Sequence, residues 1–157
     1  MSQKVDLGLS PDARGKAATA LQPVLADHYA LAVKTHAFHW NVTGPNFSGL
    51  HALFDKQYTA LFLAADEIAE RMRALGSKVH GGMGTLAKMS RIKEPGDNVG
   101  WKEMCEVLAS DCDAMVASCR KVKDEVEPLG DYETGDLMLT RMETLAKDAW
   151  MLRSHAE

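Results

Sequence analysis

Apolar side chains recur at intervals of three or four residues along four long stretches of the chain. In the second stretch, Leu50, Phe54, Leu61, Ile68 and Met72 follow this spacing. The spacing predicts amphipathic helices, each of which buries one face. The helices are expected at residues 11–42, 47–75, 101–127 and 132–155. The pattern therefore predicts an all-α protein built as a four-helix bundle.

Capping and turn residues mark where the expected helices begin and end. Ser10 and Pro11 form a helix start, in which an N-cap residue precedes a proline at the first helical position. Gly44-Pro45 is a turn signal between the first two helices. Pro23 lies inside the first helix and is expected to kink it or to delay its start.

The connection between the second and third helices is long and rich in glycine. It covers residues 76–99, enough to run from one end of the bundle to the other, and a short helix is expected within it at residues 85–91. Long crossovers of this kind join the helices of some four-helix bundles. We expect one domain at residues 11–157, preceded by a flexible tail at residues 1–10.

The composition narrows the class of protein. Apolar residues make up 46% of the chain and charged residues 25%, which is ordinary for a soluble globular protein. No apolar run reaches the roughly 18 residues that span a bilayer, and the first residues lack the apolar core of a signal peptide. We therefore expect a cytoplasmic protein without a membrane partner.

The three cysteines are spaced by seven residues on the third expected helix, at Cys105, Cys112 and Cys119. Neighbours in this series lie about 10.5 Å apart along a helix axis. This separation is too large for a disulfide or a shared metal ion. They are expected to be buried thiols that pack as small apolar side chains.

Histidines and carboxylates gather around the turn between the first two helices. His39 and His51 each lie six residues from Pro45, so an antiparallel pair of helices places them at similar heights. On the second helix, His51, Asp55, Asp66 and Glu70 fall within a stripe of roughly 100° among apolar residues. Burying such groups is costly unless they are paired or bind a metal. The three carboxylates are also explained as solvated helix charges, but their i, i+4 repetition on an apolar face argues against this explanation and predicts a metal site.

One chain cannot bring the whole stripe to one metal ion. Asp55 and Asp66 are separated by about 16 Å along the helix axis, whereas ligands lie about 2 Å from a metal. A second copy related by a two-fold axis would set Asp66 and Glu70 against the partner's His51 and Asp55 and would create two equivalent sites. Nitrogen and carboxylate ligands suit iron, zinc or manganese without choosing among them.

The sequence around this stripe closely resembles the Dps proteins, the mini-ferritins that protect DNA in starved or peroxide-stressed bacteria. The matching segments are residues 34–47, 50–51, 54–55, 66–71, 84–86 and 149–153. The resemblance implies a ferritin-like four-helix bundle with a long crossover, a hollow dodecamer, and storage of ferric oxide. It also implies that the positions of His39, His51 and Asp55 bind iron from one subunit, whereas those of Asp66 and Glu70 bind it from the other.

The resemblance implies further roles near this site and at the start of the fourth helix. Trp40, beside His39, is expected either to pack in the core or at an interface, or to intercept radicals. Asp131 and Asp136 are expected to line a pore through which iron enters. Both aspartates are also explained as charges at a helix N-terminus, where they interact favourably with the helix dipole.

The charge of the chain does not favour DNA binding. The net charge is −4, and residues 1–16 hold Lys4, Arg14 and Lys16 against two aspartates. A dodecamer of such chains repels phosphate, so DNA contact is expected to be weak or absent at physiological salt.

The function expected from the sequence is oxidation of Fe2+ by hydrogen peroxide or oxygen.

Two other functions remain open from the sequence. One is a nucleoid DNA-binding protein with little ferroxidase activity. The other is a di-iron oxygenase, which the sequence favours less because the chain contains no Glu-x-x-His motif for a metal site inside one bundle.

Overall fold

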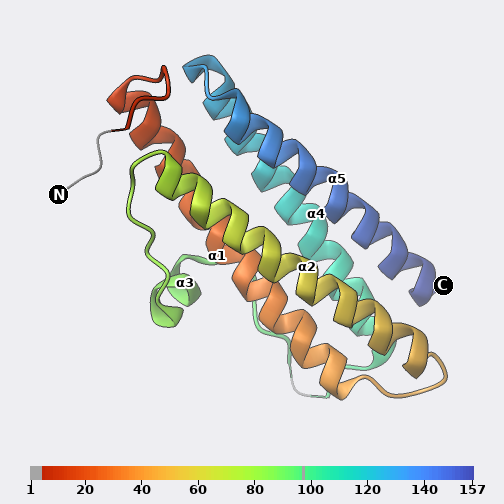
Figure 1. Ribbon diagram of the computed structural model, residues 1–157. Helices are drawn as coiled ribbons and strands as arrows, with labels where there is room; N and C mark the ends of the chain where they lie inside the picture. The colour runs from red at the N-terminus through yellow and green to blue at the C-terminus, as the bar shows by residue number, and fades with distance from the viewer. Residues whose placement is uncertain (1–4, 97) are drawn as a thin grey trace.

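Four long helices form an elongated bundle in a computed structural model, which describes residues 5–96 and 98–157 (Figure 1). The described residues contain no strand. The helices are α1 (Pro11–Asn41), α2 (Phe47–Ala74), the short α3 (Met83–Met89), α4 (Trp101–Val126) and α5 (Tyr132–Ala156), with a 3-10 turn, η1 (Glu127–Leu129), before α5. Within residues 5–96 and 98–157, no helix combines the length and the apolar character of a membrane span.

The long helices are arranged as two antiparallel pairs. Helix α1 packs along α2, α4 packs along α5, and α1 also packs on α4. The crossover leaves the top of α2 in Figure 1, carries α3 along the outside of α1, and returns to the lower end of the bundle where α4 begins. The four-helix bundle with a long crossover, as expected from the sequence, is confirmed.

The ends of α1 follow the capping signals. The side chain of Ser10 accepts a hydrogen bond from the main-chain nitrogen of Ala13, so it caps the helix as expected. Gly44, in the turn to α2, has a φ of +105°, and a Cβ added to it would lie 3.1 Å from the Trp101 ring. The turn therefore requires glycine both for its conformation and for its contact with α4.

Pro23 does not delay the start of α1. The helix begins at Pro11 and continues through Pro23 to Asn41. Proline removes one main-chain donor, but Val24, Leu25 and Ala26, which follow it, are buried in the core. Their burial stabilises the helical path locally. The expectation of a delayed start was therefore wrong.

The crossover is anchored to α1 by the buried carboxylate of Asp27. One oxygen accepts hydrogen bonds from Ser90 Oγ at 3.0 Å and from the Arg91 main-chain nitrogen at 2.7 Å. The other accepts from Arg91 Nε at 3.0 Å and pairs with Arg91 Nη2. Because the Arg91 nitrogen is bonded to Asp27, α3 ends at Met89, and the short helix lies two residues earlier than the sequence predicted.

Burial along α4 agrees with its apolar pattern. Cys105, Cys112 and Cys119 are buried free thiols, as expected. Burial raises the pKa of Cys105 to about 11 and that of Cys119 to about 12. These thiols are therefore protonated near neutral pH.

The start of the chain lies against the upper end of the bundle. Leu9 packs on the core, and the side chain of Val5 lies beside Gly76. The tail expected at residues 1–10 contains no helix at residues 5–10. Residues 1–4 lie outside the described part of the chain, so flexibility of the tail stays a prediction.

Candidate metal centre

His39 and His51 meet at the end of the α1–α2 pair nearest the turn. The Nδ1 of His39 donates to the main-chain carbonyl oxygen of His51 at 2.8 Å. In return, the Nδ1 of His51 donates to the main-chain carbonyl oxygen of His39 at 2.9 Å. The two rings stack with their centroids 3.8 Å apart. The equal spacing of these residues from the turn therefore predicted their proximity correctly.

These two hydrogen bonds determine the protonation of both rings. A carbonyl oxygen can only accept, so each Nδ1 carries a proton. In a neutral imidazole this leaves the lone pair on Nε2, the form in which histidine binds a metal through that nitrogen. Both residues are half-buried. The main chain thus leaves two Nε2 lone pairs side by side.

Asp55 lies one turn after His51 on α2, and its carboxylate is exposed. Its Oδ1 accepts a hydrogen bond from the hydroxyl of Tyr58 at 2.7 Å. This bond raises the pKa of the Tyr58 phenol above its usual value. Among the described residues, no hydrogen-bond donor contacts the other carboxylate oxygen, which is available to a metal ion.

An aromatic cluster borders the histidine pair. The ring of Tyr58 stacks on His36 with centroids 4.0 Å apart and approaches His39 edge-on at 5.4 Å. The ring centroids of His36 and Trp40 lie 4.1 Å apart. Trp40 itself is 66% exposed, so it does not pack in the core of the subunit. An interface or radical-intercepting role for Trp40 stays a prediction.

Sequence reasoning missed Tyr58 and His36 as neighbours of the centre. Tyr58 lies seven residues after His51 and three after Asp55, which places all three on one side of α2. This spacing was the available signal for Tyr58. The stacking of Tyr58 on His36 depends on side-chain rotamers across two helices, which the sequence does not reveal.

Asp66 and Glu70 lie farther along α2, and both are exposed on the subunit. Within the described residues, no group of three or more histidine, cysteine, aspartate or glutamate side chains is placed to hold a metal ion. The stripe is therefore present on α2, but it does not form a complete centre within one chain.

Asp131 and Asp136, the two residues expected at a pore, lie in different environments. Asp131 is fully buried; its carboxylate caps α5 through the Thr134 nitrogen at 3.1 Å and pairs with Arg71 of α2 at 2.5 Å. Asp136 is exposed one turn later. The geometry therefore favours the helix-start explanation for Asp131, whereas Asp136 is free to line a pore.

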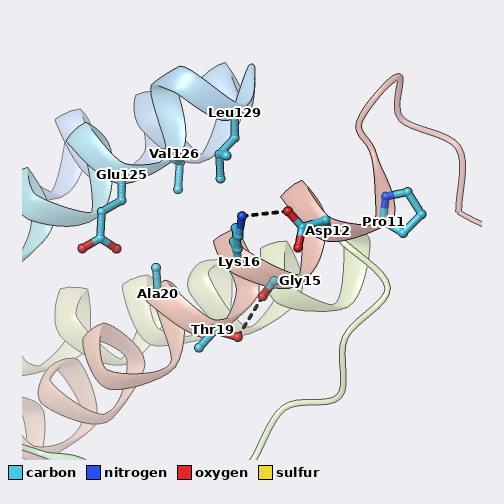
Figure 2. Close-up of a pocket in the computed structure, with 9 residues that line it drawn as sticks. All are labelled: Pro11, Asp12, Gly15, Lys16, Thr19, Ala20, Glu125, Val126 and Leu129. Carbon is cyan, nitrogen blue, oxygen red and sulfur yellow. Dashed lines mark hydrogen bonds and ion pairs between the residues drawn. The ribbon is translucent and has the colours of Figure 1, made fainter.

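A shallow cleft of about 690 Å³ opens near the opposite end of α1 (Figure 2). It lies between the first turns of α1 and the end of α4, and it contains none of the candidate ligands. Its lining is Pro11, Asp12, Gly15, Lys16, Thr19, Ala20, Glu125, Val126 and Leu129. The only ion pair drawn there joins Lys16 to Asp12 at 2.7 Å.

The chain is similar to proteins of known families over nearly its whole length. The ferritin-like domain model matches residues 18–157. DNA protection during starvation protein 2 of Bacillus anthracis is 36% identical over 134 residues, which cover 85% of this chain and 92% of that protein. The solved structure of DpsC from Streptomyces coelicolor has a TM-score of 0.94 at 26% identity, covering 100% of this chain and 92% of that one.

A second solved structure adds a description of metal chemistry. It is a Dps protein from Vibrio cholerae O1, called a member of a broad superfamily of ferritin-like diiron-carboxylate proteins. Its TM-score is 0.91 at 28% identity, covering 100% of this chain and 98% of that one.

Proposed function

This chain belongs to the Dps family of ferritin-like proteins, and on that premise we propose that it oxidises Fe2+ and stores the ferric product. Membership supports an iron-storage mini-ferritin that acts in stress. The proposal adds the reaction, the oxidant and the residues. Two Fe2+ ions each give one electron to hydrogen peroxide, which takes up two protons and leaves as two water molecules.

The observation that carries this proposal is the reciprocal pairing of His39 and His51. It leaves two Nε2 lone pairs side by side at one end of the α1–α2 pair, and Asp55 follows His51 by one turn of α2. Imidazole nitrogen and carboxylate oxygen together suit Fe2+, and zinc or manganese would compete for the same ligands. Main-chain carbonyls orient both rings through Nδ1, which leaves Nε2 of each ring as the nitrogen that would bind iron.

We propose that a second subunit completes the site with Asp66 and Glu70. Both are exposed on a face of α1 and α2 that also exposes large apolar side chains, including Val33, Trp40 and Leu63. Such a face is suited to contact with another protein surface. A two-fold pair would bring the partner's two carboxylates to the histidine end and generate two equivalent sites. Twelve subunits would then enclose a cavity for ferric oxide.

DNA is proposed to be protected by removal of Fe2+ and peroxide and not by tight contact. Of the three cations near the N-terminus, Lys16 pairs with Asp12 at 2.7 Å and Arg14 donates to the Leu75 carbonyl oxygen at 3.2 Å. Lys4 lies outside the described residues. Both described cations are thus engaged within the subunit, which supports weak DNA contact in the bacterial cytoplasm.

Iron loading without oxygen tests the proposed reaction. The protein is loaded with Fe2+ anaerobically and mixed with hydrogen peroxide, while absorbance and particle mass are recorded. We expect rapid formation of protein-bound Fe3+ in a particle about twelve times the mass of the 17.2 kDa chain. Wild-type protein that oxidises iron no faster than buffer would overturn the proposed activity, and a particle of 17.2 kDa would overturn the cage.

A further inference from the structure

We propose that the segment from the last turn of α2 to just beyond α3 is a docking surface for membranes that carry anionic lipids. This segment, residues 73–93, is called the basic crossover. It contains no aspartate or glutamate, whereas the whole chain carries a net charge of −4. Its five cations are Arg73, Lys78, Lys88, Arg91 and Lys93. Positive charge is therefore concentrated on one segment of an acidic protein.

Apolar side chains determine which side of the basic crossover faces outward. Val79, Leu86 and Ile92 pack against the core, and α3 lies along the outside of α1 (Figure 1). All five cations are exposed. Helix α1 adds little negative charge to this side, because its two acidic residues are Asp12, which is ion-paired, and the buried Asp27. The outward side of the crossover is thus positively charged.

The lysines of the basic crossover keep their charge available for a partner. Within the described residues, no recorded ion pair involves any of the three, which are Lys78, Lys88 and Lys93. The two arginines are engaged within the subunit: Arg91 pairs with Asp27, and Arg73 donates to the Ser77 carbonyl oxygen at 2.8 Å. Each lysine beside an anionic bilayer strengthens binding roughly fivefold, so three together give about a hundredfold.

Exposed methionines favour a lipid surface over other anionic partners. Met83, at the start of α3, is 84% exposed, and Met89, at its end, is 42% exposed. A bilayer interface accommodates both kinds of side chain, because cations meet lipid phosphates while apolar groups enter the boundary between headgroups and acyl chains. DNA phosphates would contact the cations alone. Three free lysines also fall short of the roughly six to ten phosphate contacts that give strong, salt-dependent DNA binding.

The acidic remainder of the chain does not prevent this contact. Thirteen of the 22 acidic residues lie at positions 101–157, in and around α4 and α5, whereas α3 packs on α1. Charges farther than about 8 Å from the bilayer are largely screened at physiological salt. Contact at the surface also needs no membrane-spanning helix. The expectation of no membrane partner rested on the lack of such a span and does not bear on surface binding.

Vesicle flotation of the assembled protein tests the proposal. Wild-type protein is mixed at about 150 mM salt with vesicles of phosphatidylglycerol and phosphatidylcholine in equal parts, or of phosphatidylcholine alone. We expect it to float only with the anionic vesicles. Lys78→Gln/Lys88→Gln/Lys93→Gln should bind them about a hundredfold more weakly. The matched control removes the same charge from exposed positions of α4 and α5 and should bind like wild type; it is Lys102→Gln/Lys121→Gln/Lys147→Gln.

A second comparison separates a lipid surface from a general site for polyanions. Met83→Gln/Met89→Gln should weaken vesicle binding roughly tenfold without changing the retention of plasmid at low salt. The proposal is wrong if wild-type protein does not bind anionic vesicles, if the two lysine variants bind them equally, or if loss of the methionines has no effect. A changed particle mass in the crossover lysine variant would identify this segment as an interface between copies of the chain and would also overturn the proposal.

Discussion

Asp131 uses a fully buried carboxylate to cap α5 and to pair with Arg71 of α2. Asp131→Ala would leave the largely buried Arg71 without this partner, and we expect a loss of roughly 3–5 kcal/mol in the free energy of unfolding. Urea denaturation measures this loss. Asp136→Ala, which changes an exposed residue of the same helix, should leave stability unchanged and slow iron uptake if Asp136 lines a pore. Equal stability of the two variants would contradict the assignment.

His28 is a buried neutral histidine whose Nδ1 donates to the Val24 carbonyl oxygen at 2.8 Å. Burial is the main cause that lowers its pKa from 6.5 to about 4. Below pH 6.5, His28 takes up a proton in the unfolded chain but stays neutral in the folded chain. The free energy of unfolding therefore falls as the pH drops towards 4. The loss attributable to His28 is roughly 3 kcal/mol.

Urea denaturation between neutral pH and pH 4 measures this dependence. His28→Gln should show a flatter decline than wild type, whatever its stability at neutral pH. His80→Gln, which changes an exposed histidine, should follow the wild-type curve. If His28→Gln and wild type decline in parallel, His28 does not sense pH.

Some residue contacts of the centre were predictable and others were not. The meeting of His39 and His51 follows from their equal distances from Pro45, a property of chain geometry alone. Their reciprocal bonds to main-chain carbonyls and the link between Tyr58 and Asp55 depend on rotamers. The ligand roles of these residues stay predictions.

At the scale of elements, Asp27 makes most of the hydrogen bonds that join the crossover to α1. Asp27→Asn removes the charge that binds Ser90 and Arg91, at a cost of about 2 kcal/mol. Hydrogen exchange at residues 83–92 should then accelerate by roughly thirtyfold. Asp12→Asn, which breaks the exposed pair with Lys16, is the control. Unchanged exchange in Asp27→Asn would show that α3 is held by apolar contacts alone.

The helices themselves were largely predictable, because capping residues and apolar spacing agree at most of their ends. The long helices begin where expected, at Pro11, Phe47, Trp101 and Tyr132. The short α3 was placed two residues late because its end is set by Asp27, which lies 64 residues from Arg91 in the chain. A contact of that range leaves no local signal.

At the scale of the whole molecule, charge should keep the protein away from DNA. Each chain carries a net charge of −4, and Arg14 and Lys16 are engaged within the subunit. We predict no stable complex with plasmid at about 150 mM salt, where screening acts beyond about 8 Å, while protection against iron and peroxide persists. A gel shift at that salt that disappears on deletion of residues 2–16 would support the nucleoid-binding alternative.

The proposed sharing of the centre between two subunits can be tested directly with oligomers that mix two inactive variants. Asp55→Ala and Asp66→Ala should each abolish rapid iron oxidation. In a random equal mixture, half of the two-fold interfaces join unlike subunits, and each of these keeps one intact site of two. The account therefore predicts recovery of about a quarter of the wild-type rate.

A mixture of wild-type subunits with the double variant Asp55→Ala/Asp66→Ala is the control. A shared site predicts about a quarter of the wild-type rate for this mixture, whereas a site within one chain predicts about half. The rate of Fe2+ oxidation in the mixture of the two single variants is the decisive measurement. Recovery near one quarter is the result predicted for a centre built by two subunits, and a mixture as inactive as its parents would contradict it.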